Sequence, residues 1–463
     1  MGGGGERFTL LWGDRDAAYS RLSYDAATGA VEIETDAAGQ LALRYAFVDG
    51  VLFVASHDLE LAPHVPFAVD EASLHHVRRV GWSVGGASLI RGIATCPPGT
   101  RVTLSDRVRT EATALPDAGD PVAACLDFLA PRLGPGRVLV ELSAGFDSRA
   151  ALAATIACKG VDGVQVFSEG PEDSQDVQVA QEICRRHGVR FERRDTAPRA
   201  PDAVLADWSD AAAANNGHLE VDVLASWERG RPQTVCGDGG EIHRGNYYPY
   251  RPFQSLRGPF PDVAEAALAR RFGRSARLDT VVDRLRRAAA SEAEVLDRFY
   301  VTERFGVWNQ KLARGGDRRI SPFYSRRAMG GLGRGLDCAL HVALIRDHLP
   351  RAADIPINGE APPSLYGGGR LTALRRDGRL FAGKIARRLR PGASLQDSRA
   401  TVMAEVLRRV PPDFLHAPAD GWAELGAQRF LRMYRDAADR ARAAARPRPH
   451  ASDRSDQVPA AGA

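Results

Sequence analysis

Two serines and an aspartate follow one short apolar segment and could bind the phosphates of a nucleotide. The apolar run 138–142 is typical of a buried strand, and the polar turn Ser143-Ala-Gly-Phe-Asp-Ser148 follows it directly. A helical pattern comes next, so backbone N–H groups at a helix N-terminus would point into the turn. Ser143 and Ser148 add hydroxyl donors, and Asp147 adds a carboxylate that could hold Mg²⁺ against phosphate oxygens. The alternative is a polar turn without a ligand.

This turn is not a Walker A loop, because that loop needs a lysine beside its serine or threonine and residues 143–148 contain none. A second segment, 167–176, again predicts a strand end, a polar loop and a helix start. In a parallel sheet its Phe167 and Ser168 would lie beside the first turn and could contact a base or a ribose. For Asp173 and Ser174 we favour a simpler role as the helix cap.

A third strand end carries more acids. Residues 234–236 predict a strand, and the glycine-rich turn Gly237-Asp-Gly-Gly-Glu241 follows. Glu241 and Asp238 could face Asp147 across the strand ends. Two carboxylates that converge on phosphates repel each other unless a divalent cation lies between them. A glycine turn with solvated acids is the alternative.

An arginine-rich turn at 312–323 is a further candidate. Arg318 or Arg319 could clamp a phosphate or a carboxylate with two parallel N–H bonds. However, only three of the 62 basic residues are lysines, so arginine is so common here that any single one is more often a solvated surface charge.

The elements that must position these residues change character along the chain. Residues 7–115 contain short alternating runs separated by Gly and Asp turns, which predict a β-rich domain. From about 122, strand and helix patterns alternate, which predicts a doubly wound parallel sheet with ligands at the C-terminal strand ends. The expected strands are 138–142, 163–167, 190–193 and 234–236, and the expected helices are 122–133, 149–158, 176–187 and 211–229. After about 260 the chain reads as helical, and 444–463 as a disordered tail.

Composition limits the class of protein. At 463 residues the chain is long enough for two domains, and its formal net charge of +4 does not argue for nucleic acid. No apolar run approaches the roughly 20 residues of a membrane span, and the N-terminus lacks a signal-peptide layout, so we expect a cytoplasmic protein without a membrane partner. The six cysteines are scattered singly, without zinc-site spacing.

Taken in order, these segments resemble the asparagine synthetase superfamily, a group of N-type ATP pyrophosphatases that includes β-lactam synthetases and lasso-peptide cyclases. The resemblance covers most of residues 40–355 and lies in 54–58, 92–100, 143–148, 237–241 and 317–323. It implies an adenine nucleotide α-hydrolase-like fold with a helical C-terminal part for 122–440. For 1–115 it implies a smaller, degenerate glutaminase-type domain.

The resemblance also implies roles for particular residues. The nucleotide would be bound by Leu142, Ser143, Gly145, Asp147, Ser148, Phe167, Ser168 and Gly237. Asp147 and Glu241 would hold Mg²⁺. The substrate carboxylate would attack the α-phosphate of ATP, and an amine would then displace AMP to form an amide.

Departures from the family pattern are informative. Glutamine-dependent members need a cysteine directly after the initiator methionine, whereas Gly2 stands there and the first cysteine is Cys96, so we expect no glutaminase activity. The family lysine that stabilises charge during amide formation is missing from 341–346. The other departures are Ala144 and Ile242.

Substitutes for the missing groups can be chosen by their position in the sequence. Arg346 could supply the charge of the family lysine, and Arg319 is the arginine chosen for the 312–323 turn. Asp207 and Asp210 are the nearest acids by position for the family's general base.

The sequence therefore predicts an ATP-dependent ligase that joins a carboxylate and an amine of a small molecule or a peptide, and it leaves a homodimer open. A lasso-peptide-type macrocyclase is one alternative. A catalytically degenerate nucleotide-binding or scaffold protein is another, favoured by Ala144, Ile242 and the missing lysine. Transfer RNA thiolation would predict paired reactive cysteines, and the cysteines are unpaired in the sequence.

Overall fold

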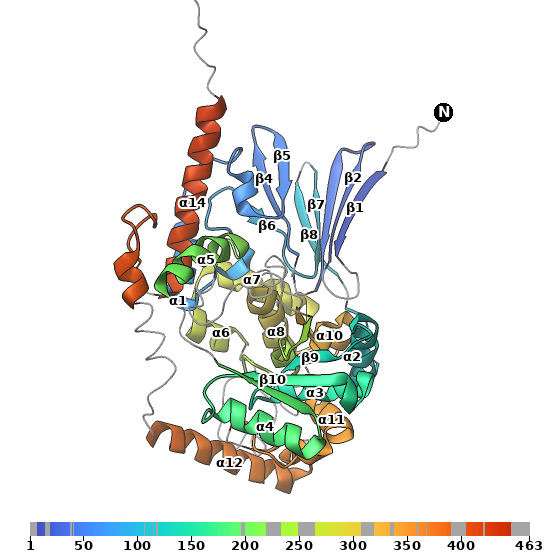
Figure 1. Cartoon of the computed structure of the whole chain (residues 1–463). Helices are drawn as coiled ribbons and strands as arrows, with labels where there is room; N and C mark the ends of the chain where they lie inside the picture. The colour runs from blue at the N-terminus through green and yellow to red at the C-terminus, as the bar shows by residue number, and fades with distance from the viewer. Residues whose placement is uncertain are drawn as a thin grey trace, which may run out of the picture.

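The fold is that of a computed structural model. It describes residues 7–13, 19–37, 39, 41–105, 107–113, 115–116, 119–195, 200–218, 233–248, 264–306, 319–333, 338–358, 361–366, 368–389, 404–419 and 422–445. In Figure 1 an antiparallel β-sandwich forms the upper part of the molecule, and a parallel sheet with its helices forms the lower part.

The sandwich consists of two antiparallel sheets with the strand orders β1-β2-β3-β7-β8 and β5-β4-β6. The strands are β1 (Arg7–Gly13), β2 (Tyr19–Asp25), β3 (Ala30–Thr35), β4 (Arg44–Val48), β5 (Val51–Ala55), β6 (Ala94–Thr95), β7 (Thr100–Leu104) and β8 (Val108–Ala112). The β-rich character of this region agrees with the sequence pattern. A small apolar cluster that includes Ile33, Cys96 and Val102 packs between the sheets.

The second sheet is parallel throughout, in the order β11-β10-β9-β12-β13. Its strands are β9 (Val138–Glu141), β10 (Val164–Glu169), β11 (Arg190–Arg194), β12 (Thr234–Val235) and β13 (Arg319–Ile320). Val140 on the central strand pairs with Val166 on one side and Val235 on the other. The order reverses between β9 and β12, as in a doubly wound sheet. The α/β class predicted from the sequence is therefore confirmed.

Helices surround this sheet and connect it to the sandwich (Figure 1). They are α1 (Glu71–Val80), α2 (Pro121–Leu129), α3 (Phe146–Lys159), α4 (Gln175–His187), α5 (Pro201–Ala214), α6 (Ala264–Phe272), α7 (Ala276–Ala288), α8 (Glu292–Phe299), α10 (Arg326–Met329), α11 (Ala339–His348), α12 (Arg370–Leu389) and α14 (Trp422–Ala445). The alanine-rich α3 packs against β9 and β10, and its close approach to them is possible because Ala150 and Ala153 have small, fully buried side chains. Ser174 caps α4, as expected.

Helices from the two ends of the chain share one apolar cluster. Trp208 of α5 and Tyr434 of α14 pack there with Val77 of α1 and Leu89, so residues from both predicted domains build it. The helix expected at 211–229 is wrong in its start: α5 begins at Pro201, and 219–229 lies outside the described residues.

Other expectations from the sequence concern the C-terminal tail, membrane-spanning helices and the cysteines. The predicted tail 444–463 lies outside the described residues except for its first two, which complete α14. Across the part of the chain that the structure describes, no helix combines the length and the apolar character needed to cross a bilayer. All six cysteines carry free thiols.

Candidate functional site

The structure brings the first and third predicted turns together at the reversal point of the parallel sheet. Asp147 follows β9 and Glu241 follows β12, and these strands are direct neighbours. In doubly wound sheets, the crevice outside the carboxyl ends of two such strands is the usual ligand site. The two acids therefore share one edge of the sheet, as the sequence predicted.

The turn after β9 is shorter than expected. Helix α3 begins at Phe146 rather than at 149, because Gly145 has the extended backbone of an N-cap. Asp147 and Ser148 consequently belong to the first helical turn, where unpaired N–H groups favour anions. The serine hydroxyls fix the turn: Ser143 Oγ lies 3.0 Å from Ser148 Oγ and accepts the N–H of Gly145 at 3.1 Å.

Two residues that the sequence analysis missed form hydrogen bonds to the backbone of the 143–148 turn. Asp176, in the first turn of α4, accepts the N–H of Ala144 at 2.7 Å. Arg149 is completely buried and donates to the carbonyls of Ala144, Ile355 and Pro356 at 3.0, 2.6 and 2.6 Å. Burial lowers the pKa of Arg149 to about 10. A charged side chain within an alanine-rich buried helix was the available signal.

Glycines allow the turn after β12 to lie directly against the start of α3. A Cβ atom on Gly237 would come within 2.5 Å of the backbone nitrogen of Ser148. A Cβ atom on Gly240 would come within 2.5 Å of the Asp147 side chain. Since real Cβ atoms do not approach that closely, both positions need glycine for steric reasons, and Gly237 acts here by its small size.

The carboxylate of Asp147 is held by two cationic or polar partners. Arg244 donates from Nε and Nη2 to its two oxygens at 2.8 and 2.7 Å, and His341 Nε2 lies 2.8 Å from Oδ1. His341 is fully buried and stacks on Phe323 with ring centroids 4.9 Å apart. Burial by itself would raise the pKa of Asp147, but the charge of Arg244 and the His341 hydrogen bond lower it to about 2.

Glu241 has the opposite electrostatic character. It lies in the short helical turn Gly240–His243, and its Oε2 atom is buried without a hydrogen-bond partner among the described residues. Burial and the nearby negative charge of Asp147 raise its pKa to about 7. Two adjacent carboxylates with such different pKa values are typical of functional sites.

This donor set can be compared with the needs of a divalent cation. Glu241 offers one unpartnered oxygen, and carboxylate oxygens are the ligands that Mg²⁺ prefers. Both oxygens of Asp147 are engaged by Arg244, so a cation would have to compete with that guanidinium for the carboxylate. Within the described ranges no three His, Cys, Asp or Glu side chains form a metal-binding group. The pair fits a cation that also takes phosphate or water oxygens.

Arg319 also reaches this edge of the sheet. From β13 it lies 3.3 Å from a carboxylate oxygen of Glu141 and 3.2 Å from one of Asp238. Its guanidinium therefore links the ends of β9 and β12. Arg318, the other arginine considered in that turn, lies outside the described residues.

Other predicted nucleotide-binding residues are placed near the edge with buried side chains. Leu142 belongs to the core around β9, and Phe167 is covered by the guanidinium of Arg194, 4.0 Å from the ring centroid. Ser168 is only 1% exposed. The described structure gives these three side chains no open surface toward a nucleotide.

The candidates for the missing lysine and the general base lie elsewhere. Arg346, on α11, points into solvent with 69% of its side chain exposed and pairs with Asp347 at 2.8 Å. The idea that it supplies charge within the site does not agree with this placement. Asp207 and Asp210 lie on α5, whose buried Trp208 belongs to the apolar cluster shared with α14, and their role as general base stays a prediction.

Comparisons with known proteins leave the family open. No protein-family model matches the chain, and no curated protein matches it. One similar solved structure is the glutamine-dependent NAD⁺ synthetase of Acinetobacter baumannii in complex with ADP. The match has 21% sequence identity and a TM-score of 0.15, and it covers 28% of this chain and 32% of that chain. The chain thus spans about a third of that synthetase.

Proposed function

We propose that this protein is an ATP-dependent ligase that adenylates a carboxylate, releases pyrophosphate and then joins the acyl group to an amine with loss of AMP. The observation that carries the proposal is the meeting of Asp147 and Glu241 at the reversal point of the sheet, against the N-terminus of α3. Residues 143–148 and 237–241 supply both acids, as they do in the asparagine synthetase superfamily that they resemble.

In this reaction a carboxylate oxygen of the substrate attacks the α-phosphorus, and the bond from that phosphorus to the bridging oxygen of pyrophosphate breaks. Ser143, Ser148 and the first N–H groups of α3 would bind the pyrophosphate oxygens, where the helix dipole favours negative charge. The amine then attacks the acyl carbon, and AMP leaves with the former carboxylate oxygen. Holding the reactants in place would supply much of the rate.

Asp147 and Glu241 are the residues that would hold Mg²⁺, and the bound cation would neutralise charge on the leaving pyrophosphate. Arg244 would then compete with the cation for Asp147, and its guanidinium would be able to bind a phosphate when it is displaced. The Arg319 guanidinium, held by Glu141 and Asp238, adds positive charge at the same edge. We further propose that the amine belongs to a small-molecule or peptide substrate; Cys96 of the β-rich region is fully buried in the sandwich core, which does not suit a glutaminase nucleophile.

One observation favours a second function, a nucleotide-binding protein without catalysis. Arg244 already satisfies both oxygens of Asp147, which leaves that carboxylate charge-neutralised without a metal. A protein that had lost catalysis would keep such an ion pair for stability. A ligase would let a cation compete with Arg244 for Asp147, whereas a non-catalytic protein would keep the ion pair. Measuring that competition therefore distinguishes the two functions.

The test is pyrophosphate release from ATP and Mg²⁺ with a panel of carboxylates and amines. We expect Asp147→Asn to reduce release by about 100-fold or more, because an amide cannot replace an anionic ligand (~2.7 kcal/mol of barrier). The matched control is Asp127→Asn, which changes a solvent-exposed carboxylate on α2. Equal loss in both variants, or none in Asp147→Asn, would contradict the assignment.

Metal binding provides a readout that does not depend on activity. Mn²⁺ can be titrated in the presence of ADP and followed by electron paramagnetic resonance. If Arg244 competes with the cation, Arg244→Gln binds Mn²⁺ more tightly than the wild-type protein and Asp147→Asn binds it more weakly. If the affinity for ADP is the same with and without Mn²⁺ in all three proteins, and no pyrophosphate is released, the non-catalytic function is supported.

A further inference from the structure

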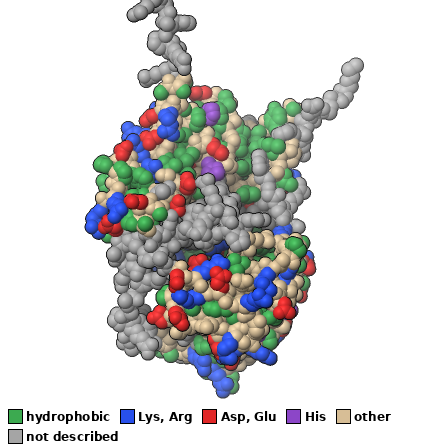
Figure 2. Space-filling view, in the orientation of Figure 1, with side chains coloured by type: hydrophobic (Ala, Val, Ile, Leu, Met, Phe, Trp, Pro, Cys, Tyr) green, Lys and Arg blue, Asp and Glu red, His purple; other side chains and the backbone are tan. Residues whose placement is uncertain are grey.

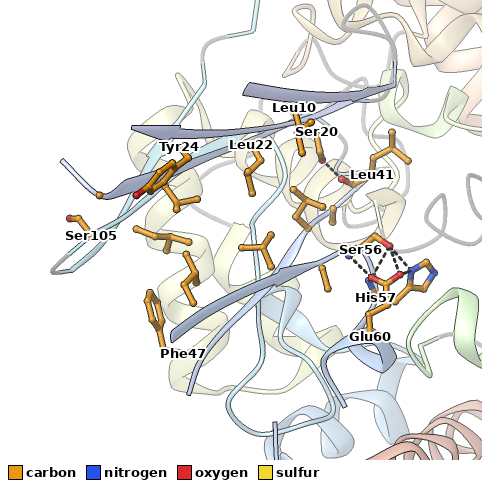
Figure 3. Close-up of a pocket in the computed structure, with 18 of the residues that line it drawn as sticks. Leu10, Ser20, Leu22, Tyr24, Leu41, Phe47, Ser56, His57, Glu60 and Ser105 are labelled. Atoms are coloured by element: carbon orange, nitrogen blue, oxygen red, sulfur yellow. Dashed lines mark hydrogen bonds and ion pairs between the residues drawn. The ribbon is translucent and has the colours of Figure 1, made fainter. Parts of the chain in front are cut away.

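A large cavity lies between the two sheets of the sandwich, away from the strand ends that carry Asp147. Its volume is about 1060 Å³. One wall comes from β1, β2, β3 and β7, and the other from the β4–β5 hairpin (Figure 3). The apolar residues that line it are Leu10, Leu22, Tyr24, Val31, Leu41, Leu43, Phe47, Leu52, Val54 and Leu104.

The cavity is too large to be a packing defect. Inner faces of two stacked sheets normally interdigitate, and few voids in protein cores exceed the size of one water molecule. Small-molecule pockets, in contrast, occupy about 300–1,000 Å³ and have mainly apolar walls with a few polar groups. This cavity belongs to the second class in both size and lining.

Some of the exposed large apolar side chains border the same space. Leu10 is 39% exposed, Tyr24 42% and Phe47 49%, and all three line the cavity. Figure 2 shows hydrophobic side chains on the surface over the strands of the sandwich. Since large apolar side chains gain by leaving water, an apolar ligand that covers them would be stabilised.

Polar groups gather at one end of the cavity. In Figure 3, Ser56, His57 and Glu60 lie at the end opposite Tyr24 and Phe47. The Glu60 carboxylate accepts the N–H groups of Ser56 and His57 at 2.8 and 3.1 Å. Burial would raise its pKa, but these backbone hydrogen bonds lower it, so Glu60 is ionised at neutral pH.

These three side chains do not form a nucleophilic triad. Ser56 Oγ lies 2.7 Å from His57 Nδ1, and the Glu60 carboxylate lies 3.7 Å from the same nitrogen. In a triad the acid and the serine bind opposite nitrogens of the ring. The cluster is therefore better suited to binding than to catalysis.

The charge of the lining selects the ligand. Glu60 is an anion, and none of the 20 lining residues in the described part of the chain is an arginine or a lysine, although the whole chain has 62 such residues. We infer that the sandwich binds an elongated amphiphile with an apolar body between the sheets and a cationic amine beside Glu60. This second site is independent of the ligase function proposed above.

Binding of matched amphiphiles tests the inference. Dodecylammonium and dodecanoate share one alkyl chain and differ in the sign of their charge, so both are titrated calorimetrically below their micelle concentrations at low salt. We expect saturable binding of dodecylammonium with about tenfold higher affinity than dodecanoate, because an exposed ion pair is weak but repulsion of the anion adds to it.

Two variants locate the site. Glu60→Gln should bring the two affinities to within about threefold of each other, whereas Glu111→Gln, on the exposed strand β8 outside the cavity, should leave their ratio unchanged. Leu22→Trp, from the middle of one wall, should weaken binding of both probes, because the indole ring obstructs the space between the sheets. If that variant does not fold, Leu52→Trp obstructs the cavity from the opposite sheet.

Several results would overturn the inference. Absence of saturable binding to the wild-type protein would exclude an amphiphile site. Tighter binding of dodecanoate would contradict the assigned charge. Unchanged binding in a folded tryptophan variant would place the probe elsewhere. Because pyrophosphate release is measured separately, failure here is distinguishable from failure of the proposed ligase function.

Discussion

The parallel sheet and the β-sandwich differ in how completely side chains fill their interiors. Around β9 the core is filled: Val140, Ala150, Leu152 and Val166 are completely buried, and a polar site lies at the strand ends above them. Between the two antiparallel sheets a space of about 1060 Å³ stays open, with Leu22 and other apolar side chains on its walls. One region presents polar groups on a filled core, and the other presents apolar walls around a cavity.

The difference teaches where each region can place a ligand. A filled core holds backbone and side chains rigidly, which suits groups such as Asp147 and Arg244 that must keep fixed distances. An open sandwich cannot fix groups so well, but it can take up apolar surface from a ligand. We therefore expect catalysis at the sheet edge and ligand storage or sensing in the sandwich.

Truncating one leucine in each region provides the most sensitive test of this comparison. Leu152→Ala should destabilise the protein by about 2–5 kcal/mol, because a new cavity forms in a filled core. Leu22→Ala should cost less than about 1 kcal/mol, because its side chain already borders empty space. Both are measured by urea unfolding. Similar losses in the two variants would mean that the sandwich interior is filled in solution.

Removing the acid of the Asp147–Arg244 pair should have the next largest effect. Asp147→Ala leaves the Arg244 guanidinium partly buried without its carboxylate, which we expect to cost about 2–3 kcal/mol after allowance for its solvent exposure. The double variant Asp147→Ala with Arg244→Ala should recover part of that loss. If the two changes are simply additive in urea unfolding, the ion pair does not stabilise the site.

The pH dependence of stability should have opposite signs at the edge of the parallel sheet and in the sandwich. We expect this effect to be smaller than those of the two preceding substitutions. The pKa of Glu241 is raised to about 7 by burial and by Asp147, so between pH 4.5 and 7 the unfolded chain ionises while the folded protein keeps the proton. Stability falls as pH rises through that window. Glu241→Gln should thus be about 1–3 kcal/mol more stable than the wild type above pH 7 and similar near pH 4.

Glu60 in the sandwich is the matched control for that experiment. Its pKa is lowered by the backbone N–H groups of Ser56 and His57, so its stabilising contribution is present above pH 4.5 and is lost as pH falls. The difference in the free energy of unfolding between the Glu60→Gln variant and the wild type should therefore become smaller as the pH is lowered. Parallel pH curves for the Glu241→Gln variant and the wild type would contradict the assigned burial of Glu241.

Local patterns in the sequence were sufficient to predict the parallel sheet and the meeting of Asp147 with Glu241. Each acid lies in a short turn that follows an apolar run, and parallel strands end at one edge of a sheet. The start of α3 was placed three residues late, because the polar residues Asp147 and Ser148 look like a loop although Gly145 permits the helix to begin before them.

The partners of Asp147 could not be predicted, since their sequence distances are large. Arg244 is one of many arginines, and His341 comes from α11, 194 residues away from the acid it contacts. Only the tertiary packing of α11 on α3 places the imidazole there. Arg346, chosen for its position near the expected lysine, points outward because it lies on the solvent face of the same helix.

The lengths of the strands on either side of the reversal point are unequal. β9 and β10 pair over four residues, whereas β12 and β13 have two residues each. Amide protons of Thr234 and Val235 should consequently exchange with deuterium sooner than those of β9, because a short ladder opens at lower cost. A ligand that contacts both Asp147 and Glu241 would connect the short strand β12 to the longer strand β9. Its binding should therefore slow the exchange of the β12 amide protons.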